Sequence, residues 1–425
     1  MAHPAANSST PNKLREFWKS LGPGVVTGAA DDDPSGIATY SVAGAQLGTA
    51  LLWTSLLTWP LMAAVQSMCA RIGMVTGRGL ASTFHTKFPR PVLAVVAGAL
   101  FLANTINIGA DLAGMADAME LLTRINSHYW VVAFAAFITW ATIRLRYIVL
   151  ANVLKWLALF LFAYVVTAFY LHPDWSTVLH DTAIPAVPHS GAAWATLVAI
   201  LGTTISPYLF FWQASQEVEE EKAMGRHTLV ERRGATPGEI LNRKIDIGIG
   251  TFFSNAVMFF IILTTALTLH AHGITSPETS KEVALALKPL AGRFASLLYT
   301  IGLVGTGILA IPTLAGSAAY ALAETFGWRQ GIDERFRRAK RFYLVLAFAI
   351  LAGMAMDFAN INAVKALYWS AVLNGLLAPF LLLGILLVAS DHRLMLNQPS
   401  SLLGRVTVAI TTLVMFGAAI GMFIV

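Results

Sequence analysis

Long apolar runs separated by short polar stretches dominate this chain from about residue 22 onward. Most runs reach or exceed the length that an α-helix needs to cross a bilayer, which is about 20 residues. We expect spans at roughly 22–43, 48–72, 92–122, 129–147, 148–171, 191–215, 246–271, 291–325, 340–356, 363–389 and 403–424. The pattern predicts an all-α polytopic membrane protein with eleven transmembrane helices. Residues 1–20 would form a cytoplasmic tail, and residues 21–425 a single transmembrane domain.

Composition and charge support this prediction and add an orientation. The chain is 56% hydrophobic and 12% charged, with a mean hydropathy of +0.65. If the N-terminus lies inside, the inner loops carry 23 of the 29 Lys and Arg residues, which is the bias of cytoplasmic loops. We therefore expect a plasma-membrane protein with an external C-terminus. The net charge of +6 then reflects membrane topology, and we expect no nucleic-acid partner. The single Cys69 excludes an internal disulfide, and no obligate protein partner is indicated.

The first expected span contains an unusual interruption. Three carboxylates, Asp31, Asp32 and Asp33, stand at membrane depth, where each costs at least ~2.5 kcal/mol. Pro34 follows them and clashes with the carbonyl of Ala30, so we expect the helix to break and that carbonyl to be free. A broken helix with a bare carbonyl and acidic groups indicates a cation site. The alternative is that the acids cap a helix beginning at Pro34, which leaves the preceding apolar residues without a role.

The sixth expected span breaks in the same way. Pro207 should free the carbonyl of Thr203. A lone proline within a span is usually a plain kink, but interruptions at corresponding places in two halves indicate a transporter's binding site. We expect five-plus-five inverted repeats at about 22–171 and 191–389, followed by an extra helix at about 403–424.

Four stretches resemble the Nramp divalent-metal transporters. Residues 22–36, GPGVVTGAADDDPSG, resemble the family's first helix with its D-P-G-N motif, and residues 66–78, QSMCARIGMVTGR, resemble its second helix. Asp111-Leu112-Ala113 resembles the D-L-A-E motif of the third helix, and residues 202–207 lie where the family has M-P-H. The resemblance covers nearly the whole chain. It implies a LeuT-type five-plus-five inverted repeat with interrupted first and sixth helices and an eleventh helix.

The chain departs from the family at the positions that bear ligands. Asp33 matches the aspartate of D-P-G-N, but Gly36 stands in place of the asparagine. The family methionine falls on Ser206, its histidine on Tyr208, and the glutamate of D-L-A-E on Gly114. This pattern resembles the Nramp-related magnesium transporters, a branch of the same family.

The chemistry of the altered positions agrees with that branch. Thioether sulfur suits soft or borderline ions, whereas oxygen ligands suit Mg²⁺, which keeps several of its waters. We predict a metal site formed by Asp33, the carbonyls of Ala30 and Thr203, and Ser206, with room for waters at Gly36. Mg²⁺ or Mn²⁺ would be the transported substrate, and we expect no cofactor.

Further polar residues are candidates for the ion pathway. Asp31 and Asp32 would reach the ion through water or attract cations to the vestibule. Asp111 matches a family position tied to proton movement, and Asn374 would line the pathway from the tenth span. For both, the alternative is a polar contact between helices. We expect the acidic run at 217–221 to be a solvated helix end, or else to draw ions at the inner exit.

We predict inward transport of Mg²⁺, and also of Mn²⁺, by alternating access and without proton coupling. Neither Tyr208 nor Gly114 can replace the titratable groups of the family's relay, because the reference pKa of tyrosine is about 10 and glycine has no such group. The alternatives are a proton-coupled Mn²⁺ or Fe²⁺ transporter of the Nramp type and an amino-acid transporter of the same fold. Three aspartates would repel a substrate carboxylate in the latter. We expect no enzyme activity, because a membrane aspartic protease using Asp33 and Asp111 would lack that class's G-x-G-D pattern.

Overall fold

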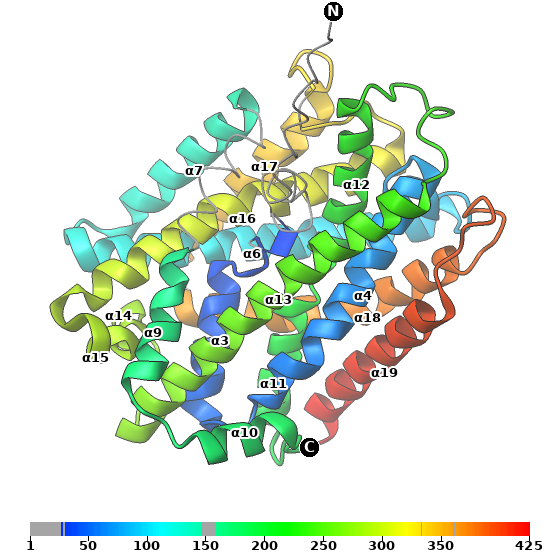
Figure 1. The fold of residues 1–425 in the computed structure, drawn as a ribbon. Helices are drawn as coiled ribbons and strands as arrows, with labels where there is room; N and C mark the ends of the chain where they lie inside the picture. The colour runs from blue at the N-terminus through cyan, green and yellow to red at the C-terminus, as the bar shows by residue number, and fades with distance from the viewer. Residues whose placement is uncertain (1–26, 29, 146–158, 333, 360–361) are drawn as a thin grey trace, which may run out of the picture.

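The computed structural model describes residues 27–28, 30–145, 159–332, 334–359 and 362–425 (Figure 1). Every regular element within these ranges is helical. In this part of the chain, six helical segments are long and apolar enough to cross a membrane: 90–123, 191–223, 237–272, 280–326, 363–389 and 402–424. The expected all-α, multi-pass architecture is confirmed, whereas the count of eleven spans stays a prediction. The expected tail at 1–20 and the first part of the expected fifth span, 148–158, lie outside the described residues.

The helices follow the expected spans closely. In the first half they are α3 (Pro34–Leu47), α4 (Trp53–Thr76), α5 (Leu80–Phe84), α6 (Arg90–Thr123), α7 (Ser127–Arg144), η1 (Leu159–Leu161), α9 (Phe162–Tyr170) and α10 (Trp175–Ala183). In the second half they are α11 (Gly191–Thr204), α12 (Pro207–Ala223), α13 (Pro237–Thr268), η2 (His270–His272), α14 (Ser280–Ala284), η3 (Leu285–Leu287), α15 (Lys288–Ala291), η4 (Gly292–Phe294), α16 (Ala295–Phe326), α17 (Lys340–Asp357), α18 (Ala363–Ala389) and α19 (Leu402–Ile424).

Local capping signals set the ends of several helices. α13 begins at Pro237, well before the expected start at about 246, because Thr236 and Glu239 form a capping box around a proline at the first helical position. The expected start was therefore too late. α4 ends at Thr76 and is capped by Gly77, whose φ of 64° is a left-handed conformation that glycine adopts without strain.

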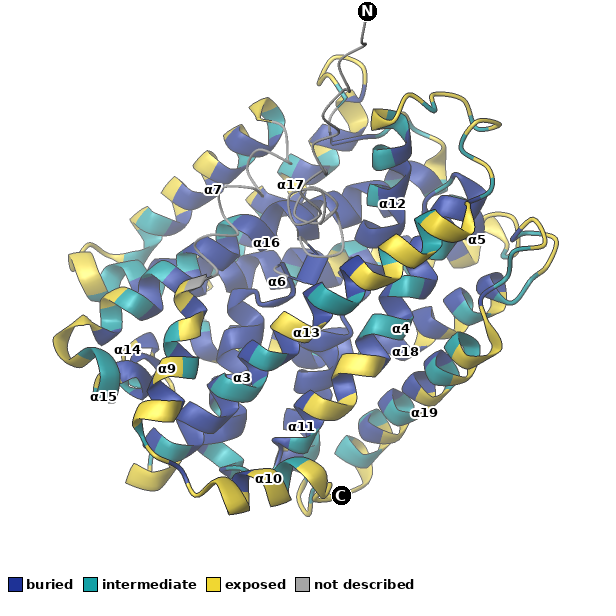
Figure 2. Ribbon diagram, in the orientation of Figure 1, coloured by how far each residue is buried: buried dark blue, intermediate teal, exposed yellow. Residues whose placement is uncertain are grey.

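The broken sixth span lies at the centre of the bundle, and α19 lies at its edge (Figure 2). In the most apolar 18-residue window of 191–223, 94% of the residues are buried, against 28% in that of 402–424. Small residues allow the central helices to approach closely. A Cβ atom added at Gly202 of α11 would lie 2.1 Å from the Ala371 carbonyl oxygen of α18, and one at Gly28 would lie 2.5 Å from the Gly250 carbonyl oxygen of α13. The two interrupted segments are thus held tightly by their neighbours.

Candidate metal site

The first interruption lies where the proline predicts it. Residues 30 and 31 are helical, the chain bends at Asp32, and α3 begins at Pro34. Asp33 is extended, and its Oδ1 accepts a hydrogen bond of 2.7 Å from the Gly36 N–H. Asp33 therefore caps α3 with one carboxylate oxygen and leaves the other for further partners.

The second interruption separates α11 from α12. Ile205 and Ser206 leave helical geometry, and α12 restarts at Pro207. The Ser206 hydroxyl does not cap α12; its Oγ lies 2.6 Å from the Gly202 carbonyl oxygen and 2.9 Å from that of Thr203. It therefore donates back into the last turn of α11, while its oxygen lone pairs remain free to accept.

The two interruptions lie against each other. The Tyr208 hydroxyl donates to the Ala30 carbonyl over 3.0 Å. A Cβ atom added at Gly36 would lie 3.0 Å from Thr203 Oγ1 and 3.4 Å from Asp33 Oδ1. The structure thus brings together the predicted residues of both breaks, and their role as metal ligands stays a prediction.

Asp33 is linked to the third expected span through Asn107 of α6. The Asn107 Nδ2 group lies 3.1 Å from Asp33 Oδ2 and also 3.1 Å from Asp111 Oδ2, so its two N–H bonds can serve both carboxylates. Asn107 Oδ1 in turn accepts from Asn374 Nδ2 over 3.0 Å. Sequence reasoning missed Asn107, although its position one helical turn before Asp111 could have indicated it.

Among the described residues, the side-chain hydrogen-bond donors to Asp111 are neutral. Ser35 Oγ donates to Asp111 Oδ1 over 2.9 Å, and the Ser35 and Ser370 hydroxyl oxygens lie 3.2 Å apart. The interhelical polar contact proposed as the alternative for Asp111 and Asn374 is therefore present. Both residues also contact Asn107, which donates to Asp33.

Asp31 and Asp32 turn the other way, toward α13. Ser254 Oγ lies 2.7 Å from Asp31 Oδ2 and 3.2 Å from Asp32 Oδ1. Asp31 Oδ1 is buried and has no hydrogen-bond partner among the described residues. The three consecutive carboxylates therefore diverge, and only Asp33 faces the junction with α6.

The site holds more buried negative charge than its neighbours compensate. Asp31, Asp32, Asp33 and Asp111 are each at most 5% exposed, and no ion pair within the described residues involves any of them. Neutral hydrogen bonds offset only part of the cost of burying a carboxylate. A cation is the group that would complete this site.

The types of ligand available are limited. Within the described part of the chain, no group of three or more His, Cys, Asp or Glu side chains is arranged to hold a metal ion. An ion at the junction would therefore take one carboxylate, Asp33, together with backbone carbonyls, hydroxyls and water. Such a set of oxygen ligands fits a hard divalent cation.

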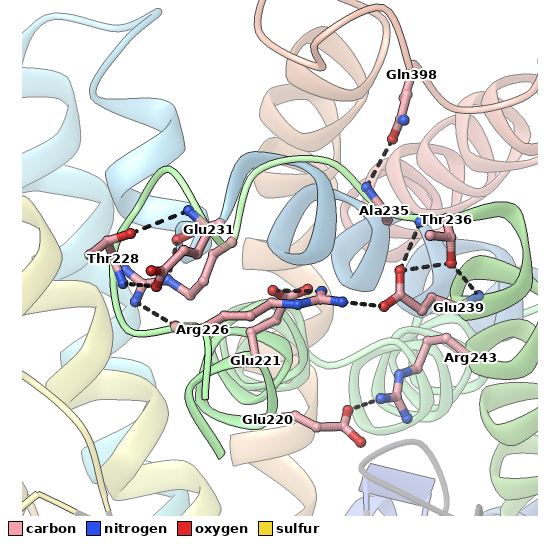
Figure 3. A network of polar contacts seen from close by, with 12 residues as sticks. Glu220, Glu221, Arg226, Thr228, Glu231, Ala235, Thr236, Glu239, Arg243 and Gln398 are labelled. Atoms are coloured by element: carbon pink, nitrogen blue, oxygen red, sulfur yellow. Dashed lines mark hydrogen bonds and ion pairs between the residues drawn. The ribbon is translucent and has the colours of Figure 1, made fainter. Parts of the chain in front are cut away.

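The acidic run after the sixth span differs from the expectation. Glu217 and Glu221 are each 2% exposed, and they form ion pairs with Arg243 at 2.7 Å and Arg226 at 3.1 Å. Figure 3 shows the network that joins the end of α12 to the start of α13. The prediction of a solvated helix end is wrong for these two residues. They stand one turn apart on α12, on the face that these arginines cover.

The fold and the two apposed helix interruptions define a multi-pass α-helical membrane protein of the LeuT type. The family model described as natural resistance-associated macrophage protein-like, Nramp, matches residues 24–425. The chain belongs to the Nramp family.

Individual relatives agree with this assignment. The "Divalent metal cation transporter MntH" of Aeromonas hydrophila is 26% identical over 420 residues, which cover 96% of each chain. Among solved structures, the manganese transporter of Eremococcus coleocola has a TM-score of 0.75 at 17% identity and covers 98% of this chain and 88% of its own. Mhp1, a nucleobase-cation-symport-1 family transporter, has a TM-score of 0.55 at 14% identity, with 95% and 92% covered. At these identities the two structures establish the fold alone.

Proposed function

We propose that this protein carries divalent metal ions into the cell by alternating access, with Mg²⁺ as its principal substrate and Mn²⁺ as a second one. Family membership supports divalent-metal transport, as do the names of the relatives. The observation that carries the proposal is the buried Asp33 carboxylate at the junction of two broken helices, which forms no ion pair with any described residue.

The oxygen-only character of the junction favours Mg²⁺. Ser206 stands where the family has a thioether, and the polar groups at the two breaks include the Ala30 and Thr203 carbonyls and the hydroxyls of Ser206 and Tyr208. Mg²⁺ retains waters and needs few protein ligands, whereas Ca²⁺ needs six to eight oxygens. We therefore expect Mg²⁺ and Mn²⁺ to compete and Ca²⁺ to be a poor substrate.

The same geometry supports transport without proton coupling. The relay position Gly114 faces an apolar side chain, since a Cβ atom there would lie 2.7 Å from Leu367 Cδ1. The Tyr208 hydroxyl is engaged with Ala30. Voltage alone provides a sufficient driving force, because two charges crossing 100 mV gain about 4.6 kcal/mol, enough for a gradient on the order of a thousandfold.

A second candidate is a proton-coupled Mn²⁺ transporter. It is favoured by one observation: Asp111 is retained and shares the Asn107 amide with Asp33. A carboxylate linked in this way to the ion-binding acid is placed to exchange a proton as the ion moves.

In both candidates we propose the plasma membrane as the location, with a cytoplasmic N-terminus, from the distribution of Lys and Arg.

Competition in proteoliposomes tests the proposed substrate. Radioactive Mn²⁺ uptake should fall as external Mg²⁺ rises into the millimolar range, and the same concentration of Ca²⁺ should have little effect. Vesicles containing the Asp33→Asn variant provide the background. Mn²⁺ uptake that millimolar Mg²⁺ leaves unchanged would contradict Mg²⁺ as the principal substrate and favour the second candidate.

A further inference from the structure

Three segments that are far apart in the sequence meet where α4 ends. The loop between α12 and α13 is joined to α4 by a hydrogen bond of 2.9 Å from the Gly234 N–H to the Val75 carbonyl. The same loop is joined to the α18–α19 loop by one of 3.2 Å from the Ala235 N–H to Gln398 Oε1 (Figure 3). Arg71 of α4 donates to the Gln398 carbonyl over 3.0 Å. The three segments therefore form one connected surface.

A cavity of about 220 Å³ lies between these segments. Each segment contributes one arginine to its lining: Arg78 follows α4, Arg233 comes from the α12–α13 loop, and Arg393 comes from the α18–α19 loop. Three threonines and two leucines complete the lining, which contains no aspartate or glutamate from the described part of the chain. The cavity has room for several waters at ~30 Å³ each, and therefore for a phosphate-sized group.

The positive charge of this cavity is not neutralised by the protein. Within the described residues, none of the three arginines takes part in an ion pair. Asp391, the acid closest in sequence to Arg393, is paired with Lys87 at 3.0 Å and accepts from the Arg393 backbone N–H. Three arginines lining one cavity without an acidic side chain give it a positive potential that favours an anion.

The threonine hydroxyls do not provide the anion's donors. Thr83 donates to the Gly79 carbonyl over 2.9 Å and Thr86 to the Thr83 carbonyl over 2.6 Å, while Thr76 donates to the Ile72 carbonyl over 2.7 Å. The donors left for a ligand are therefore the forked N–H groups of the arginines. Their planar geometry matches the oxygens of a phosphate group, which they can bind in bidentate fashion.

We propose that Arg78, Arg233 and Arg393 form a binding site for a phosphate group, carried either by a small soluble anion or by a lipid headgroup. The arginine-rich side of the bundle, which we propose is cytoplasmic, is where both sources occur. Because each arginine belongs to a different segment, a bound phosphate fastens the α12–α13 and α18–α19 loops to the end of α4. The proposal does not depend on which metal the protein carries.

Binding to purified full-length protein tests this site and distinguishes the two sources. Isothermal titration with pyrophosphate, at physiological salt and with divalent ions chelated, measures the binding of a soluble phosphate anion. For the headgroup, the thermal unfolding midpoint of the protein is compared between nanodiscs containing phosphatidic acid and nanodiscs of phosphatidylcholine alone. We expect at least one of these probes to bind the wild type, and each Arg→Gln substitution at the three positions to weaken that binding by about tenfold.

Arg337→Gln is the matched control. Arg337 lies in an arginine-rich loop, is exposed and forms no ion pair among the described residues, so its loss should leave binding within about twofold. If Arg78→Gln or Arg393→Gln does not fold, Arg233→Gln alone provides the comparison, because Arg233 is exposed on a loop. The proposal is overturned if neither probe binds, or if Arg337→Gln and Arg233→Gln weaken binding equally, which would indicate diffuse attraction to positive charge.

Discussion

The Tyr208 hydroxyl donates a hydrogen bond to the Ala30 carbonyl over 3.0 Å, joining α12 to the segment before α3. Pro34 has no N–H group, so the Ala30 carbonyl has no intrahelical donor four residues later. A buried carbonyl without a partner is costly, and Tyr208 supplies one. In the proposed site, a metal ion reaching Ala30 competes with this hydroxyl.

We predict that Tyr208→Phe tightens Mg²⁺ binding. Without the hydroxyl, the empty protein holds an unsatisfied carbonyl at a cost of about 1 kcal/mol or more, and a bound cation removes that cost. The Mg²⁺ dissociation constant should fall by about fivefold, and the empty protein should unfold at a lower temperature. Titration of purified protein measures the dissociation constant, and thermal unfolding of the empty protein measures the second quantity, with Tyr170→Phe, at an exposed tyrosine, as the control. Weaker Mg²⁺ binding in Tyr208→Phe would instead show that the hydroxyl is itself a ligand.

Asp33→Asn should abolish uptake and leave the protein folded. The asparagine side chain keeps an oxygen for the Gly36 N–H, so the cap on α3 survives while the charge is lost. Asp33→Ala should also abolish uptake and should cost about 1 kcal/mol more in stability, because the cap is lost too. Metal uptake together with the unfolding midpoint separates the two effects.

The neighbouring acids should behave differently from Asp33. Asp31 and Asp32 face Ser254, so Asp31→Asn and Asp32→Asn should raise the apparent KM and leave the maximal rate largely intact. A complete loss of uptake in either variant, with Asp33 unchanged, would place the ion on the α13 side of the break.

Ser206→Met should shift the preference toward softer ions. The new thioether would point from the N-cap of α12 into the junction, where sulfur favours Mn²⁺ and Cd²⁺ over Mg²⁺. Ser206 is 1% exposed, so the larger side chain will also cost about 1–3 kcal/mol in stability. Ser206→Ala is the control, because it removes the hydroxyl without adding sulfur. If Cd²⁺ inhibits Mg²⁺ uptake equally in wild type and Ser206→Met, position 206 does not contact the ion.

Arg243→Gln should destabilise the junction of α12 and α13 strongly. Arg243 forms ion pairs with Glu217, Glu220 and Asp246, and two of these acids are nearly fully buried. Leaving buried charges without their partner costs about 3–5 kcal/mol. Adding Glu217→Gln to Arg243→Gln should recover part of the loss, and thermal unfolding of both variants measures it. Equal stability of the single and double variants would mean that Glu217 is not stabilised by Arg243.

The interruptions were predictable because they arise from local backbone chemistry. Pro34 and Pro207 each remove an N–H that the preceding helical turn needs, and Asp33 is a favourable residue to cap the helix that follows. A proline alone does not decide a break, because Pro60, Pro312 and Pro379 lie inside continuous helices. Their meeting across the bundle was expected because the two halves of the chain each begin with a span that a proline interrupts. The divergence of Asp31 and Asp32 from Asp33 also follows from the unwound backbone.

Other features depend on tertiary packing and were missed. Asn107 joins Asp33, Asp111 and Asn374 because α3, α6 and α18 pack together there. Its place one turn before Asp111 indicates a polar face on α6, but it does not indicate which residues lie opposite that face. The burial of Glu217 follows from Arg243, which belongs to the next helix. The sequence pattern of α12 alone cannot reveal that partner.

The most direct test is a voltage-clamped uptake measurement. Liposomes containing the protein, with an inside-negative potential set by K⁺ and valinomycin, should hold one dye for Mg²⁺ and another for pH. We predict that internal Mg²⁺ rises with the imposed potential while the pH dye stays silent, and that Asp33→Asn abolishes the rise. Absence of Mg²⁺ entry in vesicles that take up Mn²⁺ would contradict the proposed substrate. Mg²⁺-dependent acidification that disappears in Asp111→Asn would contradict transport without protons.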